Sequence, residues 1–179
     1  MLIGNKVYLS ELRDGDTEDF VLWQWDTDFM NGISADVFHP FQAEDWAKMF
    51  AESDSNEAFY FTIRQVATDQ VIGFVSLTEV LFKNRRAELG IGILNPEYRG
   101  KGYGDEAVRL ILRYAFDHLG LHKVNLSVHA YNVGAIHLYE KIGFLREGVN
   151  REAIYRDGQW FDQYDYGFLQ NEYRERLDK

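Results

Sequence analysis

Cysteine is absent from the 179-residue chain, and proline occurs only twice, at Pro40 and Pro96. Without a thiol the sequence offers no disulfide, no cysteine metal site and no cysteine nucleophile. Both prolines stand in short turns, and no repeat, low-complexity segment or linker divides the chain. We therefore expect one domain over residues 1–179, of a composition compatible with a reducing cytoplasm.

Long apolar runs and an excess of basic residues are also absent. No run approaches the roughly 20 apolar residues of a membrane span, and the start, from Met1 to Lys6, lacks a basic segment followed by an apolar one. The 19 Lys and Arg against 29 Asp and Glu give a formal net charge of −10. This balance argues against nucleic acid as a partner, because phosphates attract basic surfaces. A negative field attracts a cationic substrate, although it also keeps a cytoplasmic protein soluble.

Hydrophobic residues make up 46% of the chain, as in an ordinary globular protein. Alternation and turn residues predict strands at 6–12, 58–66, 71–82, 86–94 and 123–130, and two final strands joined at residues 156–158. Helices are expected from the acidic segment 14–19 onward and at 43–52, 104–119 and 132–142. The order β-α-α-β-β-β-α-β-α-β-β, with hairpins in the middle and one crossover, predicts an α+β fold. We expect a mixed central sheet of about seven strands flanked by about four helices.

The run Arg99-Gly100-Lys101-Gly102-Tyr103-Gly104 joins a predicted strand to a long predicted helix. Glycine permits positive φ and lets the backbone approach a ligand closely. The N-terminus of the following helix offers free N–H groups and a positive dipole end, and Arg99 and Lys101 add charge. The loop therefore indicates a phosphate or pyrophosphate site, the alternative being a glycine-rich turn with solvated basic residues.

Three kinds of phosphate-binding site can be compared with the sequence of this loop. A P-loop requires Ser or Thr after its Lys, whereas Lys101 is followed by Gly102. Residues 102–107 match a dinucleotide fingerprint, but the ribose-binding acid expected about 20 residues later is missing, and the upstream strands form hairpins. Coenzyme A is the third candidate.

The coenzyme A interpretation comes with a resemblance that two motifs carry together. Arg99, Gly102 and Gly104, after a strand and before a long helix, resemble the Arg-x-x-Gly-x-Gly pyrophosphate signature of the GNAT superfamily of N-acetyltransferases. Residues 132–144 resemble that superfamily's second motif, and the order of elements is similar over essentially the whole chain. Residues 85–88 and 98–103 resemble the branch of ribosomal-protein N-terminal acetyltransferases and spermidine acetyltransferases. The resemblance implies a single-domain acyl-CoA N-acyltransferase fold, acetyl-CoA as co-substrate and no metal.

The resemblance also implies roles for particular residues. Backbone groups of the strand before the loop hold the pantetheine arm and the thioester carbonyl in the superfamily, which assigns this task to Ile91, Gly92 and Ile93. The pyrophosphate falls to the loop, namely Arg99, Gly100, Lys101, Gly102, Tyr103 and Gly104. On the following helix Asn132 binds the pantetheine arm, with Ala135 on the same face, and the Tyr139 hydroxyl protonates the CoA sulfur. The alternative for Tyr139 is a half-buried aromatic packed beside Ile136 and Ile142.

Glu88 is the candidate general base, acting through water. Period-two alternation places Glu88, Gly90 and Gly92 on one face of their strand, so that a carboxylate stands beside two positions without side chains. The alternative is a surface partner for Arg85 or Arg86. The histidines at 118, 122, 129 and 137 show no ligand spacing and are expected to be structural or exposed.

The acceptor is expected to be a primary amine, either a protein N-terminus or a small molecule, which attacks the thioester directly. A cationic amine would suit the acids and aromatics of the first helices and last hairpin: Trp23, Trp25, Asp26, Asp28, Phe29, Asp36, Phe38, His39, Trp160 and Tyr164. Two alternatives stay open, a polyamine acetyltransferase and a non-catalytic acyl-CoA-binding sensor. A homodimer or larger homo-oligomer is possible for either.

Overall fold

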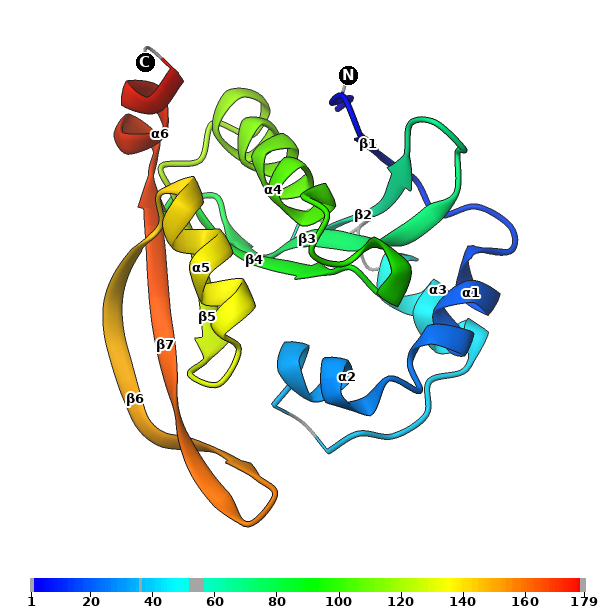
Figure 1. Cartoon of the computed structure of the whole chain (residues 1–179). Helices are drawn as coiled ribbons and strands as arrows, with labels where there is room; N and C mark the ends of the chain where they lie inside the picture. The colour runs from blue at the N-terminus through cyan, green and yellow to red at the C-terminus, as the bar shows by residue number, and fades with distance from the viewer. Residues whose placement is uncertain (1, 36, 52–56, 178–179) are drawn as a thin grey trace.

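The computed structural model describes residues 2–35, 37–51 and 57–177. Within them seven strands form one sheet, and six α-helices pack on it (Figure 1). The strands are β1 Val7–Ser10, β2 Phe59–Gln65, β3 Val71–Leu81, β4 Arg86–Gly92, β5 Lys123–His129, β6 Leu145–Arg156 and β7 Gln159–Leu169. The helices are α1 Asp16–Trp23, α2 Thr27–Ile33, α3 Ala43–Ala51, α4 Tyr103–Arg113, α5 Val133–Ile142 and α6 Gln170–Leu177.

The α+β fold and its mixed sheet are confirmed, with two short helices, α2 and α6, in addition to the predicted order. The expected helix 104–119 is α4 followed by one π-helical turn over Tyr114–His118. The last residue of the expected helix 43–52 lies outside the described residues. None of the helices in the described part of the chain is long and apolar enough to cross a membrane.

The sheet has the strand order β1-β2-β3-β4-β5-β7-β6. Neighbouring strands are antiparallel except β4 and β5, which are parallel. The predicted turn between the last two strands has positive φ at Asp157 and Gly158, of 51° and 80°. Such values match the right-handed twist of a two-residue hairpin.

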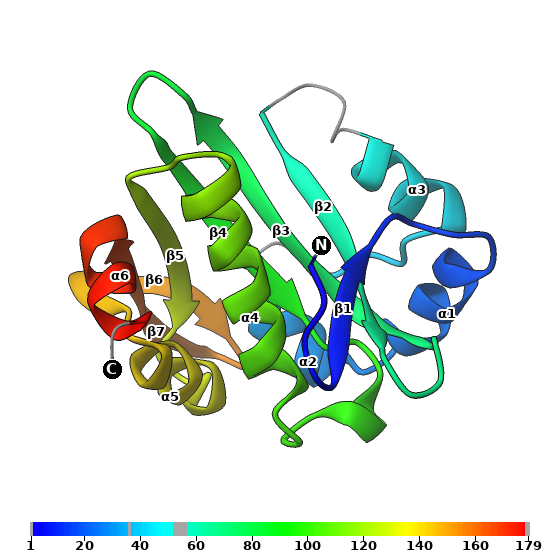
Figure 2. The same cartoon turned by 90° about the horizontal axis from the view of Figure 1, so that it is seen from above.

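Two hydrophobic clusters hold the helices on opposite faces of the sheet (Figure 2). The larger lies under α4 and α5, because α4 turns one apolar side to the strands, with residues that include Ala107, Val108, Ile111 and Leu112. The smaller lies under α1, α2 and α3 and is built around Phe20, Met30, Trp46 and Phe50. The sheet is therefore covered on both faces near its centre.

β4 and β5 pair over only three positions, Arg86 with Lys123, Ala87 with Val124 and Glu88 with Asn125. β4 keeps its other neighbour, because β3 pairs with it as far as Gly92. Beyond Glu88 the two parallel strands therefore separate, and the sheet is split at its centre.

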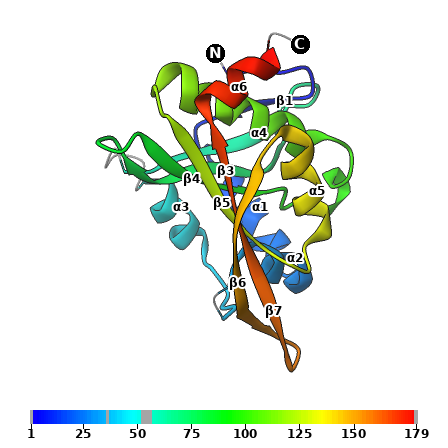
Figure 3. The same cartoon turned by 90° about the vertical axis from the view of Figure 1, so that its left-hand side faces the viewer.

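The β6–β7 hairpin extends well past the body of the molecule (Figure 3). Its far end approaches α2, where the Arg156 guanidinium lies 2.6 Å from the Asp28 carboxylate. The same guanidinium lies over the Tyr131 ring, 4.9 Å from its centre. An ion pair therefore joins the far end of the hairpin to α2.

The start of β1 is attached to the first turn of α4. The Glu106 carboxylate accepts backbone N–H groups from Asn5, Lys6 and Val7 at 2.7–2.8 Å. The Lys6 ammonium then donates to the Lys101 carbonyl at 2.9 Å. Residues about a hundred positions apart thus brace the glycine loop from outside.

Candidate active site in the split sheet

The split between β4 and β5 opens into a cleft of about 670 Å³. Its walls are the separated ends of the two strands, the loop before α4, one side of α5 and one side of α2. Along Leu89–Gly92 the β5-facing edge of β4 has no strand partner in the described residues. Backbone N–H and C=O groups require partners, so water or a ligand must satisfy this edge.

Most of the residues that the sequence singled out meet in this cleft. Those that line it are Glu88, Ile91, Ile93, Arg99, Gly100, Gly102, Gly104, Asn132, Ala135 and Tyr139. Three others, Gly92, Lys101 and Tyr103, are outside the lining. The roles assigned to all of them stay predictions, but the structure gathers most of them around one cavity.

The three residues outside the lining have other surroundings. A Cβ on Gly92 would lie 3.2 Å from the Phe74 ring, so that position is filled from β3. The Tyr103 hydroxyl accepts from the Gln65 side chain at 3.0 Å, which turns its ring towards β2. The Lys101 side chain is exposed, and its backbone carbonyl binds Lys6.

The glycine loop has the backbone expected of an anion site. Gly100 and Gly102 have φ values of 70° and 85°, a region that side chains with a Cβ rarely occupy. Gly102 caps α4, and among the described residues no side chain caps that terminus. The first N–H groups of α4 consequently lack intrahelical partners, and residues of that turn line the cleft.

The Arg99 guanidinium is engaged by the protein on three sides. It donates to the Ile93 carbonyl at 2.8 Å and to the Leu94 carbonyl at 2.6 Å, and it pairs with Asp26 at 2.5 Å. It also lies over the Phe29 ring, 3.7 Å from its centre. The hydrogen bond from Arg99 lowers the pKa of Asp26. Arg99 therefore clamps α2 to the end of β4, and its charge is already paired.

Tyr139 is buried and faces the cleft from the middle of α5. Its ring centroid lies 5.8 Å from that of Phe144, and no hydrogen bond from a described residue contributes to the pKa of its hydroxyl. Burial raises the pKa of Tyr139 to about 12. The hydroxyl is therefore protonated at neutral pH and able to donate into the cleft.

Asn132 caps α5 and at the same time ties it to α2. Its amide oxygen accepts from the Ala135 N–H at 3.2 Å, and its amide nitrogen donates to the Gly32 carbonyl at 3.1 Å. The amide nitrogen has a second hydrogen, and Asn132 is among the residues that line the cleft. Asn132 thus has a structural task beside the role that the resemblance implies.

Glu88 lies where the two strands separate, and its side chain is half-buried. Burial raises the pKa of Glu88, and the negative charges of Glu79 and Asp165 raise it further. The expected alternative was a surface partner for Arg85 or Arg86. Arg85 instead donates to the Gly120 carbonyl, and the charge of Arg86 is the smallest influence on the Glu88 pKa.

The acceptor side of the cleft differs from the expectation. Asp26 and Asp28, expected to attract an ammonium group, pair with Arg99 and Arg156. Phe29 lines the cleft, whereas Trp160 is 60% exposed on the projecting hairpin. Asp36 lies outside the described residues. The acids near the cleft without an arginine partner are those around Glu88.

Sequence patterns missed several lining residues. One of them is Ile33, which belongs to α2. The sequence signal for this helix is its N-cap Asp26, whose side chain accepts from the Phe29 N–H at 3.2 Å. His129, expected to be structural or exposed, is buried in the wall, with its Nδ1 2.7 Å from the Tyr131 hydroxyl. Burial lowers the pKa of His129. Helical spacing does not mark Lys141, because it follows Tyr139 by two positions and so starts from another side of α5, although both residues line the cleft.

Comparisons with known proteins agree with this geometry. A model of the acetyltransferase (GNAT) domain matches residues 6–145. The chain is similar to the probable N-acetyltransferase YjcK of Bacillus subtilis, with 31% identity over 90% of this chain and 93% of that protein. It is also similar to the spermidine N(1)-acetyltransferase of Vibrio cholerae, with 38% identity over 63% of this chain and 64% of that one. A crystal structure of the Vibrio cholerae spermidine N-acetyltransferase with CoA and spermine superposes with a TM-score of 0.83, at 28% identity, over 96% and 99% of the two chains.

Proposed function

The chain belongs to the GNAT acetyltransferase family of acetyl-CoA-dependent N-acetyltransferases, and we propose that it transfers the acetyl group to a positively charged primary amine. The observation that carries the proposal is Glu88, a half-buried carboxylate with a raised pKa at the point where β4 and β5 separate. Such a group can accept a proton from an amine and can attract the amine's charged form beforehand.

The cleft suits acetyl-CoA in two respects. The unpaired edge of β4, with Ile91 and Ile93 in the lining, offers backbone groups to the amide-bearing pantetheine arm. The loop from Gly100 to Gly104 offers N–H groups at the N-terminus of α4 to the pyrophosphate. Acetyl-CoA supplies an activated thioester, and the chain's own residues hold it and move protons.

The amine must first lose a proton. A lysine-type amine with a pKa of about 10.4 is neutral in only about one molecule in a few thousand at pH 7, which costs roughly 4–5 kcal/mol. Glu88, through a water molecule, receives this proton as the nitrogen bonds to the thioester carbon. Its raised pKa makes it a stronger base than an ordinary carboxylate.

The sulfur leaves as the carbon–sulfur bond breaks, and Tyr139 donates to it. A hydroxyl with a pKa of about 12 is a weaker acid than an ordinary thiol, whose pKa is about 8.5. Complete transfer to a free thiolate would therefore be uphill. Tyr139 contributes instead by a hydrogen bond to the negative charge that develops on sulfur. A proton that the attacking nitrogen loses then converts the departing thiolate into the thiol.

A polyamine is the second candidate acceptor. Glu79 and Asp165 lie close enough to Glu88 to raise its pKa, so several negative charges surround the point of reaction. A chain with several ammonium groups would match them better than a single amine. The Vibrio cholerae protein that binds CoA and spermine also shares the fold over 96% of this chain.

An amine panel tests this proposal. Thiol release from acetyl-CoA is measured with lysine-type amines, N-terminal peptides, spermidine and uncharged amides. We expect turnover with cationic primary amines at least about tenfold faster than with neutral acceptors of the same size, because charge pairing near a partly buried carboxylate is worth more than 1 kcal/mol. Saturable CoA binding without turnover of any amine would instead identify an acyl-CoA sensor.

Glu88→Gln should lower kcat/KM for the amine by at least about tenfold, because the amide cannot accept the proton. In the unmodified enzyme the basic form of Glu88 exists only above its raised pKa, so kcat/KM should fall as the pH is lowered through that value. Glu88→Gln should remove this fall and leave only the ionisation of the amine. The control is Glu97→Gln, since Glu97 is exposed on the turn before the glycine loop. A Glu88→Gln profile that kept the acidic fall would contradict the assignment.

A further inference from the structure

Two cationic side chains line the cleft in the residues that the structure describes, Arg99 and Lys141. The charge of Arg99 is paired with Asp26, as described above. Lys141 extends from the last turn of α5, and its ammonium lies 2.8 Å from the Asp105 carboxylate in the first turn of α4. Lys141 is therefore the cation placed to meet an anion at the rim of the cleft.

Asp105 holds a second cation as well. The Arg109 guanidinium, one turn along α4, lies 2.8 Å from the other Asp105 oxygen. Burial alone would raise the pKa of Asp105, but hydrogen bonds from Lys141 and Arg109 outweigh it and the pKa is lowered. One carboxylate thus faces two cations, and this rim cluster of Asp105, Arg109 and Lys141 carries an excess positive charge.

The exposure of the rim cluster shows which groups face outward. The Asp105 side chain is only 18% exposed, whereas those of Lys141 and Arg109 are 59% and 52% exposed. The carboxylate is thus the inner anchor, and the cationic ends remain reachable from solvent. An ammonium that is held at one point keeps its other N–H groups for a ligand.

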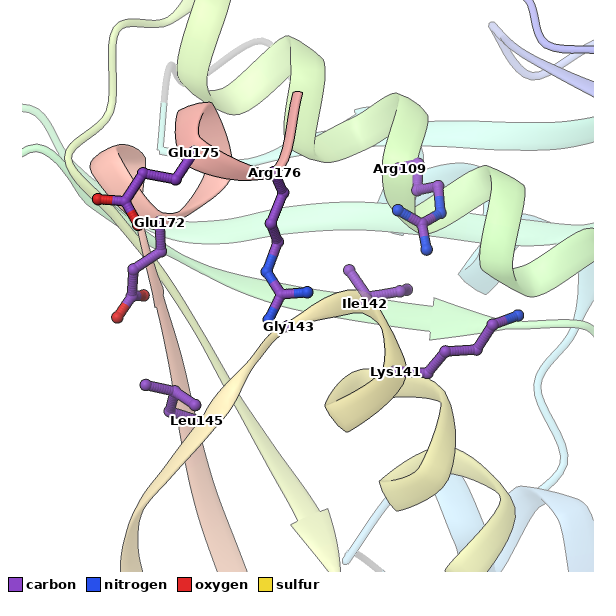
Figure 4. Close-up of a pocket in the computed structure, with 8 residues that line it drawn as sticks. All are labelled: Arg109, Lys141, Ile142, Gly143, Leu145, Glu172, Glu175 and Arg176. Atoms are coloured by element: carbon purple, nitrogen blue, oxygen red, sulfur yellow. The ribbon is translucent and has the colours of Figure 1, made fainter. Parts of the chain in front are cut away.

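A second cavity, of about 390 Å³, adjoins the cleft at Lys141, which lines both (Figure 4). Lys141 and Arg109 lie on its α4–α5 side, and Glu172, Glu175 and Arg176 lie on α6. Glu172 already accepts the Leu169 N–H at 2.8 Å. At the rim cluster the charged residues that line the cavity are therefore cations only, and on its α6 side two carboxylates accompany the cation Arg176.

We propose that the rim cluster binds the 3′-phosphate of coenzyme A. The inference rests on the proposed placement of acetyl-CoA in the cleft. Coenzyme A carries two separate phosphate positions, the pyrophosphate and the 3′-phosphate on the adenosine ribose. The glycine loop offers backbone N–H groups to the first, and Lys141 with Arg109 offers a separate set of charged donors to the second. The adjoining cavity leaves room beside them for the adenosine.

The consequence is discrimination between coenzyme A and 3′-dephospho-CoA. Dissociation constants for both are measured by titration calorimetry with the unmodified protein and with Lys141→Met, Lys141→Arg and Lys48→Met. The unmodified protein should bind coenzyme A about tenfold or more tightly than 3′-dephospho-CoA, as a charge-assisted contact predicts. Lys141→Met should lower coenzyme A affinity about tenfold and leave 3′-dephospho-CoA binding unchanged, whereas Lys141→Arg should keep most of the discrimination.

Lys48 is exposed on α3 and provides a matched loss of one positive charge away from the cleft. Lys48→Met should leave both dissociation constants unchanged. Equal affinity of the unmodified protein for the two ligands would overturn the inference and leave the proposed function standing. An equal loss for both ligands in Lys141→Met would also overturn it, because Lys141 would then act on the pyrophosphate or on the helix contact. Failure of the unmodified protein to bind coenzyme A at all would overturn the proposed function together with the inference.

Discussion

Replacement of Tyr139 by phenylalanine should lower kcat by about a hundredfold or more, while the dissociation constant of acetyl-CoA changes by less than about threefold. The ring would remain, so its contact with Phe144 in the core would be kept. The lost hydroxyl is one to whose pKa no hydrogen bond within the described residues contributes. The substitution should therefore cost little stability and remove only the hydrogen bond to the departing sulfur.

Steady-state kinetics and calorimetric binding separate these effects. Tyr166→Phe is the matched control, because Tyr166 is also buried and its hydroxyl donates to Glu140 at 2.8 Å, outside the lining of the cleft. Tyr166→Phe should change stability more than turnover. If kcat of Tyr139→Phe equals that of the unmodified enzyme, Tyr139 has no part in the departure of the sulfur.

The features that the sequence predicted well are those whose signal lies within a few consecutive residues. Alternation over a few residues marks each strand, and Gly100 and Gly102 mark a backbone with positive φ before α4. Asn132 and Gly143 mark the two ends of α5. Because such signals are local, the fold, the glycine loop and the cleft-facing helix α5 were predictable from them.

The features that sequence missed depend on contacts between distant segments. The charge of Arg99 suggested a phosphate ligand, but Asp26, 73 positions earlier, neutralises it. Lys6 reaches the glycine loop only because Glu106 holds the start of β1. α2 has only seven residues, too few for a clear helical period, and side chains from other elements, Arg156 and Asn132, hold it. No period or spacing encodes these partners, so the acceptor side of the cleft was the part least accessible to prediction.

The side of the cleft that α2 forms is supported by the hydrophobic cluster that α1, α2 and α3 share. One buried ion pair fixes α1 to the sheet. The Arg64 guanidinium on β2 contacts both oxygens of Asp16 at 2.5 and 2.6 Å, and each side chain is only 6% exposed. Arg64 also donates to the Asp69 carbonyl, and Asp16 accepts the Arg13 N–H. Removing either partner leaves the other charge buried without compensation, which is much more costly than losing an exposed pair.

Asp16→Ala should therefore lower the free energy of unfolding by about 3–5 kcal/mol. Asp16→Asn should cost less, since an amide oxygen in the place of Oδ2 can still accept from the Arg13 N–H and from one Arg64 N–H group. The control is Glu11→Ala, which breaks the exposed pair with Arg13 and should cost less than about 1 kcal/mol. Urea denaturation of the three variants measures the differences. Equal losses for Asp16→Ala and Glu11→Ala would mean that burial of the Arg64 charge does not hold α1 in place, and that the apolar contacts of Phe20 do.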